Sequence, residues 1–389
     1  MAKRLRMPLT FRELVYVSAD NLSMLVWNIL MLKKVKDNYF NDAISYRVMR
    51  KALSKCCRNV RWKDSVVGYE LHAVRNTIQL INDIRDGKYK ISPYQMFVIY
   101  EPKERNIVAT RIRDRQFQMA LCMAGLYDDI TEHFIYDNCA CQIGKGTDFA
   151  LKRIKEHMRR FYAHHGRSGW VLKLDIHHFF PTTQHSVAKA AVRKRVCDPD
   201  ACNAVCDVID SFDGDVGIGL GSQISQLVEL AVLDDLDHFI KEELHIKHYV
   251  RYMDDMVLIH EDKEYLQYCW ERIVDKLAEI HLSLNPKSCL YPISQGVKML
   301  HWRFKYTATG KINQSADNDK MGKERRRLKN ILRKETKGDV EQGTAARSLE
   351  AWCSNMEKGN TFFQCKRMIE FYIKTKGELY ERNNSRKVA

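Results

Sequence analysis

The spacing of hydrophobic residues changes along this chain, and it predicts helices first and strands later. In the stretches 19–40 and 68–89, apolar residues recur every three or four positions, as they do on one face of a helix. From residue 94 apolar and polar residues alternate, which predicts two strands around a polar turn at 101–104 and a helix that begins near Arg113. The pattern therefore predicts a helical region followed by a β-hairpin.

Helices and strands alternate through the rest of the chain. The segment 170–182 predicts a buried strand that ends at Pro181, and 249–260 predicts a β-hairpin of β-branched and aromatic residues. The remaining predictions are a helix at 147–165, a glycine-rich loop and long amphipathic helix at 214–244, a helix then a strand at 264–285, a hairpin at 296–312 and a helical tail from Asp317. Hairpins mixed with helices favour an α+β fold.

Two adjacent carboxylates, Asp254 and Asp255, interrupt the predicted hairpin at 249–260. A solvated turn is one interpretation, because acidic residues are common at hairpin tips. The flanking residues Met253 and Met256, however, are not the Asn-Gly or Asp-Gly pairs typical of tight turns. The other interpretation is a pair of hard oxygen ligands for Mg²⁺, which requires a third carboxylate from elsewhere in the fold.

Asp175 is the candidate for that third carboxylate, because it follows the apolar run 170–174. By itself it is equally consistent with a loop-start Asp that accepts hydrogen bonds from backbone donors. If its strand lies beside the hairpin, three carboxylates converge and repel one another. Two divalent cations ~4 Å apart would relieve that repulsion, activate a 3′-hydroxyl and stabilise a leaving pyrophosphate. This combination predicts a nucleotidyl-transfer site.

Composition and charge narrow the class of partner. The chain has 389 residues, 45% hydrophobic and 29% charged, which indicates a globular protein of several subdomains. Its 64 Lys and Arg against 49 Asp and Glu give a net charge of +15, which favours a polyanionic partner, nucleic acid first. No apolar run is long enough to span a membrane and no signal peptide is evident, so we expect a cytoplasmic protein without membrane partners.

A second basic feature lies near the C-terminal end, where the predicted helix 323–334 is rich in Lys and Arg. One interpretation is an ordinary solvated helix face. The other is a contact with the phosphates of a nucleic-acid backbone through Arg325, Arg326 and Lys329, while Leu328 packs inward. The twelve cysteines lack the paired spacing of zinc ribbons, so we predict reduced cysteines and no structural zinc.

Five segments, "LDIHHFFPT", "GLGSQISQ", "YVRYMDDMVLI", "LNPKSCLYP" and "GVKMLHWRF", resemble the successive palm motifs of reverse transcriptases in order and spacing. The resemblance covers roughly residues 94–373 and is closest to bacterial enzymes of diversity-generating retroelements and antiphage defence. It implies an α+β right-hand polymerase. The implied domains are a helical N-terminal extension at 1–90, fingers at 91–165, a palm with inserted fingers elements at 166–312 and a basic helical thumb at 313–389.

The resemblance also implies roles for single residues. Asp175, Asp254 and Asp255 would hold two Mg²⁺ ions, with the main-chain carbonyl of Ile176 as a candidate further ligand. Lys287 matches a position that protonates the leaving pyrophosphate, although a plain surface lysine is an equal alternative. The implied dNTP-binding residues are Lys103, Arg105, Arg115, Phe180, Leu220, Gly221 and Gln226. The implied primer and template contacts are Tyr252, Met253, His301, Trp302, Arg325, Arg326 and Lys329.

Three of these positions carry specific expectations. A bulky ring at Phe180 would reject a 2′-hydroxyl by overlap, so the product should be DNA; ordinary core packing is the alternative. Leu220 stands where most reverse transcriptases have Gln. Mutagenic retroelement enzymes also carry an aliphatic residue at this position, which predicts reduced fidelity. His301 replaces a usual Gly at the primer grip and alters primer geometry, unless it is only a solvent-facing strand histidine.

The resemblance implies an RNA-directed DNA polymerase that makes cDNA from a dedicated, structured non-coding RNA, and we expect a role in antiphage defence. The alternatives are a mutagenic reverse transcriptase of a diversity-generating retroelement and a catalytically silent nucleic-acid-binding scaffold. The helical region at 1–90 is the candidate docking site for an RNA, a second copy of the chain or a protein primer. The expected further partners are a second copy in a homo-oligomer or an accessory protein.

Overall fold

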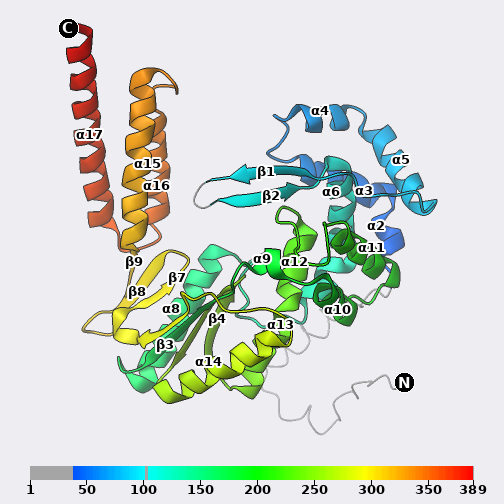
Figure 1. Cartoon of the computed structure of the whole chain (residues 1–389), viewed down its shortest axis with the longest axis horizontal. Helices are drawn as coiled ribbons and strands as arrows, with labels where there is room; N and C mark the ends of the chain where they lie inside the picture. Colours follow the sequence, from blue (N-terminus) through cyan, green and yellow to red (C-terminus); the bar gives the residue numbers. More distant parts are fainter. Residues whose placement is uncertain (1–37, 101–103, 389) are drawn as a thin grey trace, which may run out of the picture. The chain divides into compact units, whose positions relative to one another are not determined.

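The computed structural model describes residues 38–100 and 104–388, which belong to two compact units (Figure 1). Of the described residues, the first unit takes in 38–90, Ile112–Asp129 and Arg195–Val205, and the second takes in the rest. Among the helices in these described ranges, none combines the length and apolar character needed to cross a bilayer. The domain boundaries inferred from the sequence stay predictions.

The first unit is helical, as the periodicity of 68–89 predicted. Its helices are α2 (Phe40–Ala43), α3 (Tyr46–Cys57), α4 (Asp64–Leu71), α5 (Ala73–Arg85) and α6 (Ile112–Leu121). Leu53, Cys57 and Val66 form a small buried cluster that holds α3 and α4 together. Most of the helix predicted at 19–40 lies outside the described residues.

The second unit begins with the predicted hairpin of β1 (Gln95–Ile99) and β2 (Arg105–Ala109), which pair antiparallel. Every residue of β1 is exposed, so this strand is held by its backbone hydrogen bonds to β2. The amide of Val108 on β2 donates to the carbonyl of Leu220 at 3.0 Å, which ties the hairpin to the glycine-rich loop.

A four-stranded antiparallel sheet forms the centre of this unit, in the order β4-β5-β3-β6. Its strands are β3 (Trp170–Asp175), β4 (His248–Tyr252), β5 (Asp255–His260) and β6 (Cys289–Pro292). The predicted hairpin at 249–260 is therefore confirmed. Val250 and Val257 face a core shared with α8 (Thr147–His165), a helix with the predicted bounds.

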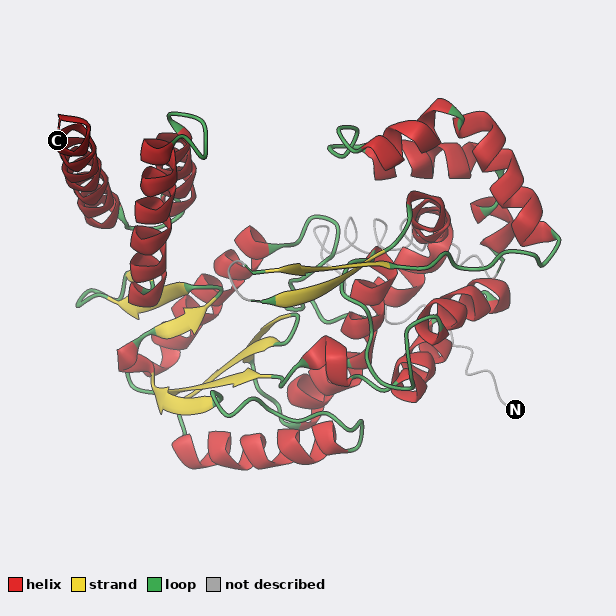
Figure 2. Cartoon of the chain, turned by 45° about the horizontal axis from the view of Figure 1, so that its top comes forward, coloured by secondary structure: helices red, strands yellow, loops and turns green. Residues whose placement is uncertain are grey.

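Side chains alternate across the sheet, so Tyr249 and Arg251 lie on its other face. Both contact Asp237 of α13 (Asp234–His238) on that face. The long helix α14 (Lys263–Ala278) also packs against β3 and β5 and lies along the sheet in Figure 2. Helices thus pack against both faces of the sheet.

Three predicted elements differ from the structure. The strand predicted at 170–182 ends at Asp175, because His178 adopts a φ of 47° and starts the short helix α9 (Phe179–Thr182). The long helix predicted within 214–244 is divided into α12 (Gln223–Val232), α13 and a π-helical turn. The strand predicted at the end of 264–285 is reduced to one bridge between Ile176 and Leu284, because the proline at 286 has no amide to pair.

A second sheet and three helices complete the unit, and the hairpin predicted at 296–312 and the helical tail are both confirmed. The sheet contains β7 (Val297–Met299), β8 (Trp302–Tyr306) and β9 (Ile312–Ala316), and the helices are α15 (Asn318–Lys337), α16 (Thr344–Met356) and α17 (Phe362–Val388). Trp302, Leu328 and Trp352 join these parts in one core. The remaining helices are α7 (Tyr127–Thr131), α10 (His185–Arg195) and α11 (Pro199–Asp210).

Candidate active site

The two neighbouring strands β3 and β5 bring the three predicted carboxylates together. Asp175, the last residue of β3, is paired in register with Asp255, the first residue of β5. Opposed residues of antiparallel strands have Cα atoms about 4.5–5.5 Å apart and point to the same face. Asp254 precedes Asp255 in the turn, and all three side chains are half-buried. The register therefore places Asp175 opposite Asp255, with Asp254 next to Asp255 in the turn.

The electrostatics of Asp254 reflect this crowding. The pKa of Asp254 is raised from 3.8 to about 6. Burial is the largest cause, and the negative charges of Asp175 and Asp255 also contribute. The cation of Arg105 on β2 acts in the opposite direction. Removal from water and repulsion between like charges both favour the protonated form. A positive ion bound here would reverse the effect and keep Asp254 ionised.

Lys173 supplies one positive charge to this face of the sheet. Its Nζ donates to Oδ1 of Asp255 at 2.9 Å and to the carbonyl of Lys298 on β7 at 3.2 Å. Lys173 stands two residues before Asp175 on β3, so the three side chains share one face. An ammonium is thus bound to one carboxylate oxygen of Asp255.

We tested whether the donor set fits divalent cations. Within the described ranges, no group of three or more His, Cys, Asp or Glu side chains has an arrangement that could hold a metal ion as it stands. The chemistry of the donors nevertheless fits Mg²⁺, because carboxylate oxygens are the ligands this hard cation prefers. The raised pKa of Asp254 and the ammonium bound to Asp255 both indicate a site that demands positive charge.

The loop before β6 supports Asp175 through its backbone. The amide of Asn285 donates to the carbonyl of Asp175 at 2.7 Å, and the amide of Asp175 donates to Oγ of Ser288 at 3.3 Å. Lys287 lies in this loop with an exposed side chain. Ile176 is buried and bridged to Leu284. The roles of Lys287 and of the Ile176 carbonyl stay predictions.

The turn that presents Asp254 contains only two residues, Met253 and Asp254, because Tyr252 pairs directly with Asp255. Met253 adopts a φ of 55°, which a side chain other than Gly, Asn or Asp seldom takes. The unusual turn chemistry seen in the sequence therefore corresponds to a strained backbone. Tyr252 and Met253 are half-buried at this tip.

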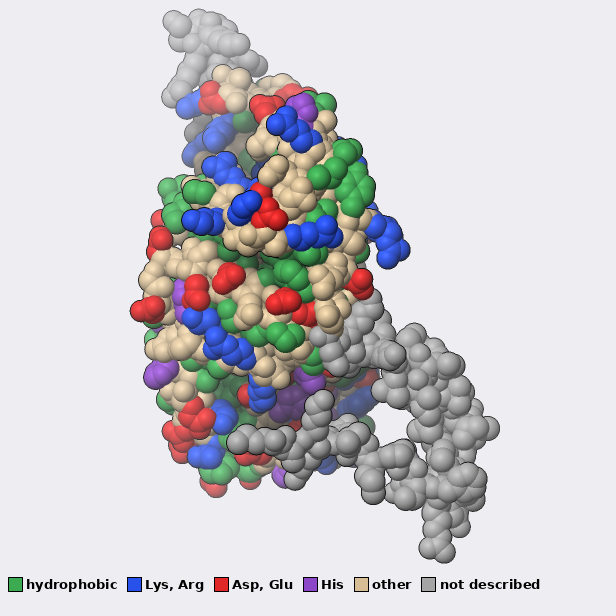
Figure 3. All heavy atoms as spheres, turned by 90° about the vertical axis from the view of Figure 1, so that its right-hand side faces the viewer, with side chains coloured by type: hydrophobic (Ala, Val, Ile, Leu, Met, Phe, Trp, Pro, Cys, Tyr) green, Lys and Arg blue, Asp and Glu red, His purple; other side chains and the backbone are tan. Residues whose placement is uncertain are grey.

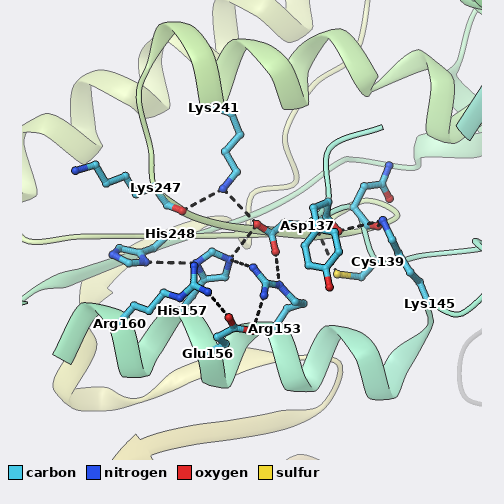
Figure 4. A network of polar contacts seen from close by, with 12 residues as sticks. Asp137, Cys139, Lys145, Arg153, Glu156, His157, Arg160, Lys241, Lys247 and His248 are labelled. Atoms are coloured by element: carbon cyan, nitrogen blue, oxygen red, sulfur yellow. Dashed lines mark hydrogen bonds and ion pairs between the residues drawn. The ribbon is translucent and has the colours of Figure 1, made fainter. Parts of the chain in front are cut away.

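A buried polar network lies beside β4 below the turn (Figure 4). The carboxylate of Asp137 accepts from Nε of Arg153 at 2.6 Å, pairs with Nε2 of His157 at 3.0 Å and lies 3.4 Å from Nζ of Lys241. Burial acts to raise the pKa of Asp137, but His157 and Arg153 hold it well below its usual value. The carbonyl of Asp137 accepts from the amide of Arg251, so this contact with β4 is made by the backbone of Asp137 and not by the side chains of the network.

The glycine-rich loop lies against β2. A Cβ on Gly221 would meet the carbonyl oxygen of Val108 at 2.6 Å, so only glycine allows this close approach. Leu220 precedes it with a half-buried side chain, and Gln226 follows on α12, also half-buried. Arg105 is exposed at the start of β2. The loop and the hairpin thus place four predicted nucleotide-binding positions in this unit.

Phe180 is half-buried in α9, whereas its neighbour Phe179 belongs to the core. The carbonyl of Phe180 accepts from the amide of Ile218 at 2.8 Å, which joins α9 to the glycine-rich loop. A ring that is only partly covered is consistent with a sugar contact. Arg115 lies on α6 in the first unit, and Lys103 lies outside the described residues, so both roles stay predictions.

The predicted primer-grip residues His301 and Trp302 have different surroundings. His301 is exposed in the turn between β7 and β8, where Leu300 and His301 adopt φ values of 50° and 67°. A two-residue turn of this type requires positive φ at both positions, which explains why glycine is usual there. His301 is therefore a turn residue and not a strand residue. Trp302 is buried, and its ring packs directly against Gly359, where an added Cβ would come within 2.5 Å of the ring.

The basic helix α15 has the two-sided character that its sequence predicted. Leu328 and Leu332 are buried, while Arg325, Arg326 and Lys329 are exposed. The guanidinium of Arg325 lies over a ring of α17 at 5.5 Å from its centroid.

Lys and Arg side chains stand among hydrophobic ones on the face of the molecule seen in Figure 3, which is the right-hand side of Figure 1.

Sequence reasoning missed three residues around the site: Lys173, Glu229 and Arg251. Glu229 on α12 is 0% exposed, burial raises its pKa well above the usual value, and the charge of Asp254 contributes in the same direction. Oγ1 of Thr183 donates to its Oε2 at 3.0 Å. Each missed residue is a lone charge inside an apolar run, and that pattern is the signal that could have identified it.

The match to a protein family agrees with this geometry. The family model described as reverse transcriptase (RNA-dependent DNA polymerase) matches residues 103–303. Among solved structures, the chain is similar to telomerase from Candida albicans in complex with a TWJ fragment of telomeric RNA, at 10% identity, with 77% of this chain and 62% of that chain covered and a TM-score of 0.45. It is also similar to apo telomerase from Candida tropicalis, at 11% identity, with 80% and 67% covered and a TM-score of 0.49.

The chain thus spans less than two thirds of the first of these structures. No curated protein matches it. The family match at 103–303 includes the β3 and β5 strands and all three carboxylates, and it extends over more than half of the sequence. The chain therefore belongs to the reverse transcriptase (RNA-dependent DNA polymerase) family and has the mixed α+β fold of a right-hand polymerase.

Proposed function

We propose that this chain copies RNA into DNA from dNTPs with two Mg²⁺ ions held by Asp175, Asp254 and Asp255. The observation that carries the proposal is the register pairing of Asp175 with Asp255, next to Asp254 in the turn. When bound, the ions would activate the primer 3′-hydroxyl and stabilise the leaving pyrophosphate. The carbonyl of Ile176 is the further ligand in this proposal.

Other residues would bind and orient the nucleotide. Arg105, whose charge acts on Asp254, suits the triphosphate. The resemblance to reverse transcriptases implies the same role for Lys103 and Arg115. The half-buried ring of Phe180 would pack under the sugar and exclude a 2′-hydroxyl by overlap. Lys287, on the loop that bonds to Asp175, would give a proton to the departing pyrophosphate.

A primer-extension assay tests this proposal. The parent and the Asp254→Asn variant are compared on poly(rA)/oligo(dT) with dTTP and Mg²⁺. Asn keeps the size of the side chain but removes its negative charge, so incorporation should fall by about 10²-fold or more, as expected when a ligand of a two-metal centre is lost. Asp275→Asn on α14, an exposed carboxylate, is the matched control and should keep parental activity.

Two outcomes would defeat the proposal. One is a folded parent that incorporates no dNTP on any RNA template. The other is equal incorporation by the parent and Asp254→Asn, which would mean that the clustered carboxylates play no part in the chemistry. The second outcome would favour the alternative of a catalytically silent nucleic-acid-binding scaffold.

For the biological role, we propose that the enzyme acts in the cytoplasm on a dedicated non-coding RNA in antiphage defence. The net charge of +15 supports a nucleic-acid partner, and the helices α2–α5 ahead of the hairpin support a separate docking region for that RNA, a second copy or an accessory protein. Sequencing of the RNA that copurifies with the chain tests the template. A plaque assay that compares the parent with Asp254→Asn tests the defence role.

A mutagenic retroelement enzyme is the second candidate, and Leu220 favours it. An aliphatic side chain beside Gly221 cannot form the hydrogen bonds that Gln would offer to the base pair or sugar. A template repeat and a variable repeat near the gene would support this alternative. Their absence, together with phage protection, would support the defence role.

A further inference from the structure

Arg251 is a fully buried cation directly below the turn that carries Asp254. Its Nε and Nη2 donate to the two carboxylate oxygens of Asp237 at 2.7 and 2.6 Å, and both side chains are 0% exposed. Oη of Tyr249 donates to Oδ1 of Asp237 at 2.7 Å. The Asp237 carboxylate therefore fixes the plane of the guanidinium from α13.

The third nitrogen of the same guanidinium contacts the turn itself. Nη1 of Arg251 donates to the carbonyl oxygen of Met253 at 3.1 Å, and Nη2 also donates to the carbonyl of Leu230 at 3.4 Å. Met253 has a φ of 55°, and a residue in this region persists only where its surroundings compensate the strain. The bond from Arg251 provides such compensation at the residue before Asp254.

The energetics argue that this pair has a geometric role. A buried ion pair is weak evidence for stability, because the desolvation of both charges offsets most of their attraction. Only the planar guanidinium can bind a carboxylate with two nitrogens while a third reaches a carbonyl; a lysine ammonium has no such fork. Arg251 thus does something that an apolar pair of equal volume, or a lysine, would not do.

We propose that Arg251 is a positioning residue that clamps the Met253 carbonyl and thereby holds the carboxylates of Asp254 and Asp255 in the orientation that binds divalent cations. The inference rests on the proposed function of these carboxylates. Asp237 orients the clamp, and neither residue touches the substrate. The clamp lies on the sheet face opposite to Lys173, Asp175 and Asp255, so it acts through the backbone of the turn.

The test compares Arg251→Lys with Arg153→Lys. Arg153 is a matched control because it also pairs with a buried carboxylate, Asp137, at 2.6 Å, but makes no bond to the turn (Figure 4). Mn²⁺ binding is measured by electron paramagnetic resonance without substrate, and folding by circular dichroism. Loss of a residue that orients a ligand typically costs about 10–100-fold in metal affinity, so we expect that loss for Arg251→Lys alone.

A double variant separates positioning from stability. The variant is made in a Tyr249→Phe background, because the Tyr249 hydroxyl would otherwise lose its acceptor Asp237. In that background, Arg251→Met with Asp237→Leu removes both charges and keeps apolar volume, a change that often preserves stability. It should fold, bind Mn²⁺ as weakly as Arg251→Lys, and show a lower kcat with a nearly unchanged KM for dNTP. Parental Mn²⁺ affinity in the folded double variant, or equal losses in Arg251→Lys and Arg153→Lys, would overturn the inference.

Measurements on the parent protein separate a failure of the proposed function from a failure of the Arg251 clamp. If the parent binds no Mn²⁺ and extends no primer, the proposed function fails and the clamp has nothing to position. If the parent does both and the variants match it, only the clamp is wrong.

Discussion

Nζ of Lys173 lies 2.9 Å from Oδ1 of Asp255, so a lysine ammonium is bound to a carboxylate of the proposed metal site. The two side chains are 26% and 20% exposed, a setting in which an ion pair contributes only modestly to stability. Mg²⁺ must displace this ammonium from Asp255, which costs about 1 kcal/mol for such a pair. For Lys173→Met we therefore expect half-maximal activity at a Mg²⁺ concentration that is about fivefold lower, the ratio that corresponds to this free energy. Primer extension across a Mg²⁺ titration measures this shift.

Lys298→Met is the control for that prediction. Lys298 lies on β7 and takes part in the contact with Lys173 only through its main-chain carbonyl, so removal of its side chain should leave the Mg²⁺ requirement unchanged. An increased Mg²⁺ requirement in Lys173→Met would mean that the ammonium orients Asp255 and does not compete with the metal.

The pH dependence follows from the pKa of Asp254, which burial and the neighbouring carboxylates raise from 3.8 to about 6. In the metal-free protein, Asp254 gains a proton as the pH falls through about 6, so Mn²⁺ affinity should fall there. The folded state binds this proton more tightly than the unfolded state, so the group adds to the free energy of unfolding as the pH falls from 6 toward 3.8. Denaturant unfolding of the parent and of Asp254→Asn at several pH values checks the sign, because the variant should lack this contribution.

Glu229 offers a test of a buried neutral acid. Its side chain is 0% exposed, and burial raises its pKa well above the usual value, which favours the protonated form. Glu229→Gln keeps the shape and the acceptor for Thr183, and we expect a change of less than about 1 kcal/mol in the free energy of unfolding. Glu229→Ala should cost about 2 kcal/mol or more because it leaves a cavity and removes one of the two acceptors of the Thr183 hydroxyl.

Thermal or denaturant unfolding at pH 7 compares these two variants of Glu229. A large loss in Glu229→Gln, similar to that in Glu229→Ala, would show that the carboxylate is ionised and paired in the folded protein.

Leu220 is expected to influence fidelity. Its carbonyl is bonded to Val108 of β2, so the backbone position is fixed and a substitution changes the side chain alone. Leu220→Gln adds a donor and an acceptor beside the nascent base pair, and we expect fewer misincorporations per template base. Deep sequencing of products from the parent and the variant on one template provides the measurement. Leu220→Met, which adds no hydrogen-bonding amide, is the control, and an unchanged error spectrum in Leu220→Gln would remove the hypothesis.

The exposed cations of α15 should bind phosphates of the template–primer duplex. For Arg325→Ala, Arg326→Ala and Lys329→Ala together, binding should weaken equally on all sequences, and the slope of log K against log salt should shrink by about 1 for each phosphate that the variant no longer neutralises. Fluorescence anisotropy at several salt concentrations measures this. Lys263→Ala, at the start of α14, is a control for charge alone. An unchanged salt slope in the triple variant would indicate a solvated helix face.

Local patterns in the sequence predicted much of the fold because they depend on neighbouring residues only. The helix at Thr147–His165 follows from its apolar spacing, and the hairpin of β4 and β5 follows from its alternation. The strand predicted to reach Pro181 was too long, since the positive φ of His178 depends on tertiary contacts and not on residue type.

By itself, the sequence determined which residue types were available: three carboxylates after strand-like runs, a basic amphipathic helix and a glycine-rich loop. Only the tertiary structure decided that Asp175 pairs with Asp255, that Lys173 binds Asp255, and that Arg251 bonds to the turn. The physical reason is that register and side-chain partners come from packing between segments far apart in the chain, where a shift of one residue would turn every side chain to the opposite face.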